Sequence, residues 1–434
     1  MALVVQKYGG SSLADADRIR HVAGRIARER ARDSETVVVV SAMGDTTDDL
    51  LALAARITDE PDPRELDLLL ATGEHMSGTL VAMALHAQGV AAISLTGAQA
   101  GIRTDASHGR ARIANVDPAR VRRELDAGRV VIVAGFQGTT DDSLAAGEVT
   151  TLGRGGSDTT AVALAAQLGA DRCEIYTDVE GIYTADPRLV PGARLLPIIG
   201  HEEMLELAHQ GAQVMQTRAV ELGWVNGVEI VVRSTFSDHP GTRITEDPHV
   251  EQRNKVRGLA ADRKVAKVTI VAVPDRPGVA RTLFTPLADA GINVDMIVQN
   301  VSHAGATDIS FTIGQTDLAQ ATRLLEPLVR EIGARELTTD AGVAKVSIVG
   351  AGIHNAPGYA ARMFGALADA GINIEMISTS EIRITCVIEE AQVEAAMRAL
   401  HAAFELERPE PTEPPGPVDP PDAGVSPVSA DADA

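Results

Sequence analysis

Residues 1–12 of this 434-residue chain read Met-Ala-Leu-Val-Val-Gln-Lys-Tyr-Gly-Gly-Ser-Ser, a short apolar run that ends in a lysine and two glycines. Apolar side chains such as Ile19 and Val22 then follow at helical spacing to about Ala31. The pattern predicts a strand, a glycine turn and a helix. Free amides at a helix N-terminus beside Lys7 attract phosphate, so the turn is a candidate anion site, although a purely structural turn gives the same pattern.

Two further segments favour a nucleotide site. The glycine loop Thr150–Asp158 (TTLGRGGSD) runs into an alanine-rich helical pattern at 159–169, again with amides at a helix start. It is not a Walker A loop, because Gly-x-x-x-x-Gly-Lys-Ser/Thr occurs nowhere in the chain. The segment Tyr176–Arg188 (YTDVEGIYTADPR) follows a predicted strand, and its turn formers, with Tyr183 and Arg188, could hold a base and a polyphosphate. Together the three segments favour a nucleotide-binding enzyme over three coincidental turns.

The sequences KYGGS, TLGRGGSD and TDVEGIYTADPR resemble motifs of the amino-acid kinase family, and within it those of the aspartokinases. The order and spacing match from residue 1 to about residue 406. The resemblance implies an enzyme that transfers the γ-phosphoryl group of ATP, with Mg²⁺, to the side-chain carboxylate of aspartate, giving 4-phospho-aspartate. Such an enzyme serves lysine (diaminopimelate), threonine and methionine biosynthesis. Another amino-acid kinase and a catalytically inactive amino-acid sensor are the alternatives.

Length and composition indicate a globular protein of two or three domains. The formal net charge of −21 argues against nucleic acid as a partner. No apolar run approaches the roughly 20 residues of a membrane helix, and the N-terminus resembles no secretory signal, which predicts a cytoplasmic protein without a membrane partner. Cys173 and Cys386 are expected to be buried free thiols. The acidic, proline-rich segment 407–434 is expected to be a disordered tail.

The first 235 residues alternate β-branched runs with helical patterns, and most of the runs are continuously apolar. Such runs are typical of parallel strands that are covered on both faces. The fold class is therefore predicted to be α/β, a three-layer helix–sheet–helix sandwich (the amino-acid kinase fold), with ligands at the carboxyl ends of its strands. The predicted strands are Leu3–Gln6, Thr36–Ser41, Ala91–Leu95, Val130–Gly135, Glu174–Thr177 and Val228–Val232.

An internal repeat follows a polar connector at 236–263. The sequence Leu-Ala-Asp-Ala-Gly-Ile-Asn at 287–293 recurs at 367–373, and the flanking segments match as well. The order of strand and helix patterns predicts two ferredoxin-like βαββαβ units, at 264–340 and 341–406. They resemble ACT domains, which commonly bind amino acids at their mutual interfaces. The alternative is that they serve only as dimerisation modules.

Catalysis by such an enzyme rests on neutralising charge. A carboxylate nucleophile is already ionised at neutral pH, so it requires no general base, and the obstacle is bringing an anion up to a polyphosphate. The resemblance implies that Lys7 is the cation on the transferring phosphoryl group and that Asp158 orients this lysine or a metal-bound water. Aspartate also favours helix caps, which is the alternative for Asp158. No metal cage is apparent, so Mg²⁺ is expected to arrive with ATP.

The resemblance also implies the binding residues. Arg154 has a planar fork suited to the α-carboxylate of the substrate, and Glu74 would take the α-ammonium. The expected substrate-binding residues are Ser41, Thr47, Glu74, Gly135, Arg154, Gly155, Gly156 and Ser157. The expected nucleotide-binding residues are Lys7, Tyr8, Gly9, Gly10, Thr177, Asp178, Tyr183 and Arg188. Several relatives carry a second phosphate-binding lysine after the sixth strand, where this chain has Phe236 or Ser237, and Arg233 is the candidate substitute.

The repeats are expected to bind lysine and threonine as effectors and to mediate self-association. The expected effector-binding residues are Asp275, Gly278, Ala280, Asn293, Gln299, Asn373, Ile374 and Ser380. Related actinobacterial-type chains pair with a shorter chain translated from within the same message. No methionine occurs between Met215 and Met296, so Val250 is the candidate start of such a chain, and a simple homodimer is the alternative.

Overall fold

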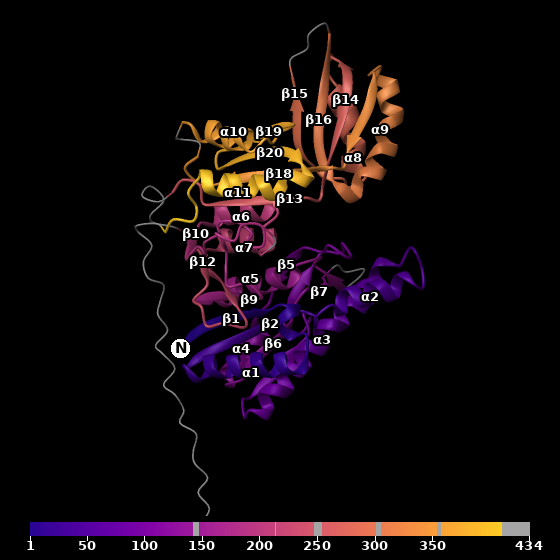
Figure 1. Cartoon of the computed structure of the whole chain (residues 1–434). Coiled ribbons are helices and arrows are strands. Elements are labelled where there is room, and N and C mark those ends of the chain that lie inside the picture. The colour runs from indigo at the N-terminus through magenta and orange to yellow at the C-terminus, as the bar shows by residue number, and fades with distance from the viewer. Residues whose placement is uncertain (142–146, 213, 247–253, 301–304, 354–356, 410–434) are drawn as a thin grey trace, which may run out of the picture.

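The computed structural model describes residues 1–141, 147–212, 214–246, 254–300, 305–353 and 357–409. The N-terminal 240 or so residues form one body, and the two repeats lie beside one another at one end of it (Figure 1). The predicted acidic tail and the candidate start at Val250 fall outside the described residues, apart from the first residues of the tail segment.

An eight-stranded sheet forms the centre of the N-terminal body, in the order β10-β12-β11-β9-β1-β2-β6-β3. All neighbouring pairs are parallel except β11 with β12. The predicted α/β sandwich is therefore confirmed, and each of the six predicted strands corresponds to a strand of this sheet. The strands are β1 (Ala2–Tyr8), β2 (Ser34–Val40), β3 (Ala92–Leu95), β6 (Val130–Ala134), β9 (Arg172–Thr177), β10 (Ile198–Ile199), β11 (Ile230–Ser234) and β12 (Thr242–Ile244).

Helices cover both faces of this sheet, and alternate residues of β2 pack against different helical layers. Val38 and Val40 belong to the apolar cluster under one helical layer, whereas Val37 and Val39 belong to the cluster under the other. A strand that is buried on both faces must be apolar at every position, which is the pattern seen in the sequence. The first layer contains α1 (Ala16–Ala31) and α3 (Pro63–Ala87); the second contains α4 (Ala119–Asp126), α5 (Gly156–Leu168), α6 (His201–His209) and α7 (Thr217–Asn226).

Helix α3 is long and apolar enough, by length and composition, to cross a membrane. Half of the most apolar window of α3 is buried, and the helix packs on α1, β3 and β6. Its buried face also carries two carboxylates, Asp67 and Glu74. These contacts identify α3 as a core helix of the sandwich.

Smaller elements surround one end of the central sheet. A second sheet, in the order β5-β4-β7-β8, lies beside the carboxyl ends of the main strands. Helix α2 (Thr46–Ala55) contains no buried residue and packs mainly on α3. The remaining elements here are β4 (Ile102–Thr104), β5 (Ile113–Val116), β7 (Gln137–Thr140), β8 (Val149–Thr151) and the 3-10 turn η1 (Gly10–Leu13).

The first repeat is a ferredoxin-like unit, as predicted, with the strand order β15-β16-β14-β17. Its apolar core joins the sheet to α8 and α9. Its elements are β14 (Val265–Pro274), α8 (Val279–Asp289), β15 (Val294–Gln299), β16 (Ala306–Gly314), the 3-10 turn η2 (Gln315–Asp317), α9 (Leu318–Ile332) and β17 (Glu336–Asp340).

The second repeat differs from its prediction in the source of one strand. Its own residues supply three strands, and the fourth is β13 (Gly258–Asp262) from the predicted connector, which pairs antiparallel with β18. No strand follows the last helix within the described residues, so the open edge of β18 finds its backbone partners in β13. The other elements are β18 (Val343–Val349), α10 (Tyr359–Asp369), β19 (Met376–Thr379), β20 (Arg383–Glu389), the 3-10 turn η3 (Glu390–Gln392) and α11 (Val393–Ala403).

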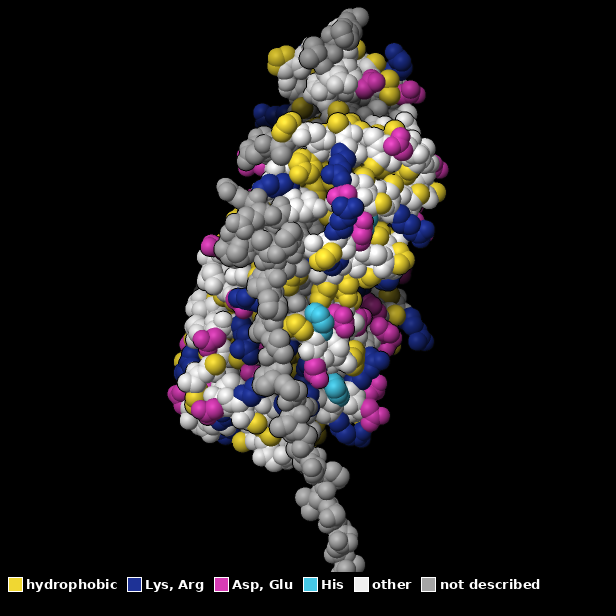
Figure 2. Space-filling view, turned by 60° about the vertical axis from the view of Figure 1, so that its left-hand side comes forward, with side chains coloured by type: hydrophobic (Ala, Val, Ile, Leu, Met, Phe, Trp, Pro, Cys, Tyr) yellow, Lys and Arg dark blue, Asp and Glu magenta, His cyan; other side chains and the backbone are white. Residues whose placement is uncertain are grey.

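The two repeats contact each other through equivalent positions. Lys267 on β14 donates to Glu375 (2.9 Å), and its counterpart Lys345 on β18 donates to Asp295 (2.5 Å). A small apolar cluster that includes Met296 and its counterpart Met376 lies between the sheets. On the face shown in Figure 2, acidic and basic side chains are interspersed over both parts of the molecule.

Candidate active site

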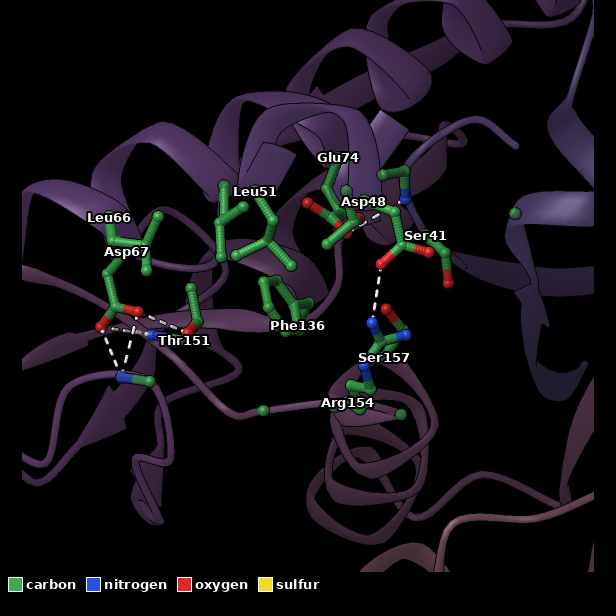
Figure 3. A pocket seen from close by; sticks show the side chains of 18 of the residues that line it. Ser41, Asp48, Leu51, Leu66, Asp67, Glu74, Phe136, Thr151, Arg154 and Ser157 are labelled. Atoms are coloured by element: carbon green, nitrogen blue, oxygen red, sulfur yellow. Dashed lines mark hydrogen bonds and ion pairs between the residues drawn. The ribbon is translucent and has the colours of Figure 1, made fainter. Parts of the chain in front are cut away.

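A cavity of about 440 Å³ opens at the carboxyl ends of β1 and β2, between α3 and the glycine loop that precedes α5 (Figure 3). Parallel strands present their C-terminal ends at one edge of a sheet, which is where ligands bind in open α/β folds. The cavity brings together nine of the residues predicted from sequence: Lys7, Gly10, Ser41, Thr47, Glu74, Arg154, Gly155, Gly156 and Ser157.

Lys7 and Asp158 form an ion pair at the floor of the site. The ammonium of Lys7 lies 2.7 Å from Oδ1 of Asp158, and both side chains are about nine-tenths buried. Lys7 is at the end of β1, and Asp158 is in the first turn of α5, so the pair joins the strand to the helix N-terminus. The helix dipole adds partial positive charge beside the lysine. The arrangement provides a fixed cation for an incoming anion.

The glycine loop before α5 has a backbone that larger residues would disturb. Gly155 is in the left-handed region (φ 73°), and a Cβ atom built on it would lie 2.5 Å from Cγ of Gln216. Gly135, another expected site residue, packs against the same loop. A Cβ atom on it would lie 2.8 Å from Oγ of Ser157, so Gly135 packs beneath that serine instead of lining the cavity.

Glu74 presents a buried oxygen to the cavity. Its Oε1 accepts the backbone N–H of Ala42 (3.0 Å), whereas Oε2 is buried and has no hydrogen-bond partner among the described residues. Burial raises the pKa of Glu74 to about 7, although the backbone N–H groups of Glu74 and Ala42 oppose the shift. A buried, unpaired carboxylate oxygen is costly unless a cation or donor joins it. The side chain is therefore suited to bind an ammonium group.

Arg154 lies at the open side of the cavity. Its side chain is 84% exposed, and its guanidinium donates to Asp48 of α2 (2.7 Å). Helix α2 has no buried residue of its own, so this contact links an exposed helix to the glycine loop. A pair this exposed contributes little to stability and leaves the fork of Arg154 available to another carboxylate.

Asp67 is a site residue that the sequence analysis missed. Its carboxylate is buried and accepts hydrogen bonds from His108 Nδ1 (2.8 Å), the N–H of Gly109 (3.0 Å) and both the N–H and the hydroxyl of Thr151 (3.1 and 2.5 Å). It lies seven residues, or two helical turns, before Glu74 on the same face of α3, as Figure 3 shows. Asp67 thus fastens the start of the glycine loop to the helix that carries Glu74.

Phe136 is a second missed residue. It lines the cavity and has a positive φ of 67°, which is strained for a bulky residue. Its N–H donates to Thr160 Oγ1 (3.2 Å), and its carbonyl accepts the N–H of Leu152 (2.8 Å), so two neighbouring elements hold the strained backbone in place. Strain of this kind gathers at functional sites. No sequence pattern that we used signals it.

The expected nucleotide residues fall into two groups. Gly9 is next to Lys7, and its N–H donates to the carbonyl of Tyr176 (3.2 Å). The ring of Tyr8 is fully buried on the other face of the sheet and stacks on Tyr176, with 4.7 Å between centroids, so the side chain does not reach the cavity. The other four lie outside this cavity's lining: Thr177 is the last residue of β9, and the segment that follows carries Asp178, Tyr183 and Arg188.

Arg233, the candidate substitute for the missing lysine, contacts a buried carboxylate in this structure. Its guanidinium donates to Glu174 (3.3 Å) inside a buried network that also contains Arg172 and Gln6. Burial opposes ionisation of Glu174, but the two arginines outweigh it and hold the pKa of this carboxyl below its usual value. The loop that follows is held by α1, where Arg25 donates to the carbonyl of residue 235 (3.0 Å).

The expected effector residues lie in corresponding parts of the two repeats. The first group is at the turn before α8, and Gly278 there has φ 98°. The asparagines precede β15 and β19 at equivalent positions. The complete set is Asp275, Gly278, Ala280, Asn293 and Gln299 in the first repeat, and Asn373, Ile374 and Ser380 in the second.

Comparisons with known proteins agree with this architecture. Residues 2–234 match the model of the amino acid kinase family, and residues 267–330 and 346–404 match ACT domain models. The chain is 53% identical over 411 residues to a protein of Mycolicibacterium smegmatis named aspartokinase, covering 94% of this chain and 97% of that one.

Two solved structures of E. coli aspartokinase III are also similar. The complex with aspartate and ADP (R-state) is 27% identical with a TM-score of 0.77, and the match covers 92% of this chain and 99% of that one. The complex with lysine and aspartate (T-state) is also 27% identical, with a TM-score of 0.70 and coverage of 93% and 99%.

The raised pKa of Glu74 predicts a pH-dependent stability difference. The folded protein holds this proton up to about pH 7, whereas the unfolded chain releases it near 4.5. Between these values the folded state binds more protons, so the wild-type protein loses stability as pH rises, by up to about 3 kcal/mol. Glu74→Gln should avoid this loss. Denaturant melts at several pH values should show the variant's stability advantage growing from pH 4.5 to 7 and then levelling; a constant difference would contradict the assignment.

Proposed function

This chain belongs to the aspartokinases of the amino acid kinase family, and on that basis we propose which of its residues bind the substrates and transfer the phosphoryl group. The reaction class is phosphotransfer from ATP to aspartate. The observation that carries the residue assignment is that Oε2 of Glu74 has no hydrogen-bond partner among the described residues and shares one cavity with Lys7, whose ammonium pairs with Asp158. One site therefore offers an acceptor for an ammonium group and a cation for a phosphoryl group.

Aspartate binds by its two backbone charges in this proposal. The α-ammonium pairs with Glu74, and the α-carboxylate takes the fork of Arg154 in place of Asp48. Ser41, Thr47 and the amides of the glycine loop complete the contacts, and Gly135 supports Ser157 from below. Held at both ends, the substrate directs its side-chain carboxylate towards Lys7.

The transfer step requires charge neutralisation more than proton transfer. The side-chain carboxylate of aspartate is ionised at neutral pH and attacks as it is. Lys7 stabilises the negative charge on the transferring phosphoryl group, and Asp158 keeps the ammonium in position. Both groups are fixed by elements of the sandwich, so little reorganisation is needed when ATP binds.

ATP fits the backbone around Gly9 and Gly10. A Cβ atom at Gly10 would lie 2.9 Å from the carbonyls of Ala42 and Gly44, so the chain is close-packed there and offers amides instead of side chains. The phosphates would contact the amide of Gly10 and the ammonium of Lys7, because the N–H of Gly9 already donates to Tyr176. Mg²⁺ enters with ATP and neutralises phosphate charge when bound. The base would be held by the segment with Thr177, Asp178, Tyr183 and Arg188.

The repeats are the proposed regulatory part. Lysine and threonine are the proposed effectors, and the turn residues Asp275–Ala280 offer helix-start amides to an amino-acid carboxylate. A relative, E. coli aspartokinase III, is known in complex with lysine and aspartate, which supports lysine. Self-association through the repeats is part of the proposal, with or without a short chain. A cytoplasmic location is proposed as well, in keeping with the two buried free cysteines.

Replacing Lys7 tests the catalytic assignment. Lys7→Ala removes the cation on the transferring group, so kcat should fall about a hundredfold or more while the aspartate KM changes little. A coupled assay of ADP release with aspartate as substrate measures both constants. A variant that keeps more than about a third of the wild-type kcat would refute this role.

Arg154→Lys tests the assignment of Arg154 to the α-carboxylate of aspartate. It keeps the positive charge but loses the bidentate fork, so the aspartate KM should rise about tenfold with ADP affinity unchanged. Loss of ADP affinity would instead assign Arg154 to the nucleotide.

Calorimetry tests the effectors. Lysine and threonine should each release or absorb heat on the purified protein and inhibit ADP release. If neither amino acid gives heat or inhibition, the repeats serve only as contacts between chains.

A short companion chain would be visible in native extract. An antibody against the repeats should detect full-length protein and a second band of less than half its mass, as expected for a start near Val250. A single full-length band would leave the homo-oligomer as the assembly.

A further inference from the structure

The segment between β9 and α6 extends from the proposed nucleotide site into the second repeat. Ala185 and Val190 are buried in the same apolar cluster as Leu400 and Phe404, at the end of α11. In addition, Nε of Arg398 donates to a backbone carbonyl of this segment (residue 189, 3.0 Å). The segment is thus part of the core of the second repeat.

Thr184 lies at the centre of this junction and is fully buried. Its carbonyl accepts the N–H of Leu259 in β13 (2.8 Å), and its hydroxyl accepts the N–H of Arg194 (2.9 Å). The same hydroxyl is 3.0 Å from Nε2 of His401 in the last turn of α11. Three separate elements therefore meet at one residue.

The protonation pattern of this contact follows from its partners. The Thr184 hydroxyl already accepts from Arg194, so its own hydrogen can donate to Nε2 of a neutral His401. His401 is buried, and burial lowers its pKa; the Glu407 carboxylate opposes this shift and Arg194 adds to it. The neutral ring is therefore the form present near pH 7.

We propose that His401 of the second repeat is a positioning residue for ATP, acting through Thr184 on the segment that carries Tyr183 and Arg188. The proposal rests on the proposed function in one respect, namely that this segment binds the nucleotide. Tyr183 is adjacent to Thr184 in the chain, so a shift of the Thr184 backbone moves the tyrosine directly.

Two other contacts between the parts of the molecule do not involve the nucleotide segment. Ser347 of β18 donates to Gln210 at the end of α6 (3.0 Å), and both side chains are buried. Arg383 pairs with Glu206 of the same helix (2.8 Å). Helix α6 carries none of the proposed ligand residues, so these contacts join the domains without touching the nucleotide segment. They provide the matched controls.

The test uses the full-length protein and near-isosteric variants. Thr184→Val removes the hydroxyl, and the ADP Kd from calorimetry and the ATP KM should both rise about five- to tenfold, with the aspartate KM within about twofold of wild type. Thr184→Ser keeps the hydroxyl and should restore both values. Ser347→Ala breaks an interface hydrogen bond elsewhere, so it should lower the melting temperature without changing the ADP Kd.

A second variant removes the histidine partner of the same hydrogen bond. His401→Leu should reproduce the shift in ADP Kd, and the double variant with Thr184→Val should add no further loss, because the same hydrogen bond is already absent. A merely structural effect would instead add, and it would appear in the melting temperature. If His401→Leu folds poorly, the comparison of Thr184→Val with Thr184→Ser still decides the question.

The possible results distinguish the positioning role of His401 from the nucleotide assignment of the segment. If the wild-type protein binds ADP and both single variants bind it equally well, the positioning role is wrong and the proposed function stands. If the wild-type protein does not bind ADP, the nucleotide assignment fails and this inference fails with it.

Discussion

The ion pair between Lys7 and Asp158 is the contact on which the other features of the site depend. A nearly buried ammonium needs a carboxylate close by, because an unpaired charge in such a position is costly. The pair can form only if β1 ends where α5 begins, and that geometry requires the tight glycine loop between β8 and α5. The requirement for a cation at the sheet edge therefore determines the backbone around it.

Helix α3 divides two tasks between two carboxylates on one face. Asp67 has every oxygen engaged and holds the glycine loop, whereas Glu74 keeps one oxygen unpaired. The first is stabilising because its hydrogen bonds compensate for burial. The second is destabilising in the empty protein and gains a partner only with a ligand. The second oxygen of Glu74 thus favours ligand binding and lowers the folding stability of the ligand-free protein.

The sequence was sufficient for the sandwich because strands buried on both faces form continuous apolar runs, as at residues 37–40 of β2 and throughout β6. The motif residues are consecutive in the sequence, and nine of the predicted site residues line one cavity. The sequence did not predict the role of a residue where that role depends on a partner far away in the chain. Asp67 looks like an ordinary helical aspartate until Thr151 is beside it, and Arg233 looks free until Glu174 engages it. Strand β13 was missed because five residues of a polar connector give no pattern until the edge of β18 is known.

Strand β13 determines how the two repeats are connected along the chain. Residue 258 precedes the first repeat and pairs with residue 349, which follows it. The first repeat is therefore an insertion within the second, joined to it at both ends rather than at one. During synthesis β13 must wait for the whole inserted unit to emerge before its partner exists, and closing such a long loop is slow. Once closed, the double connection restricts how far the two repeats can rotate apart.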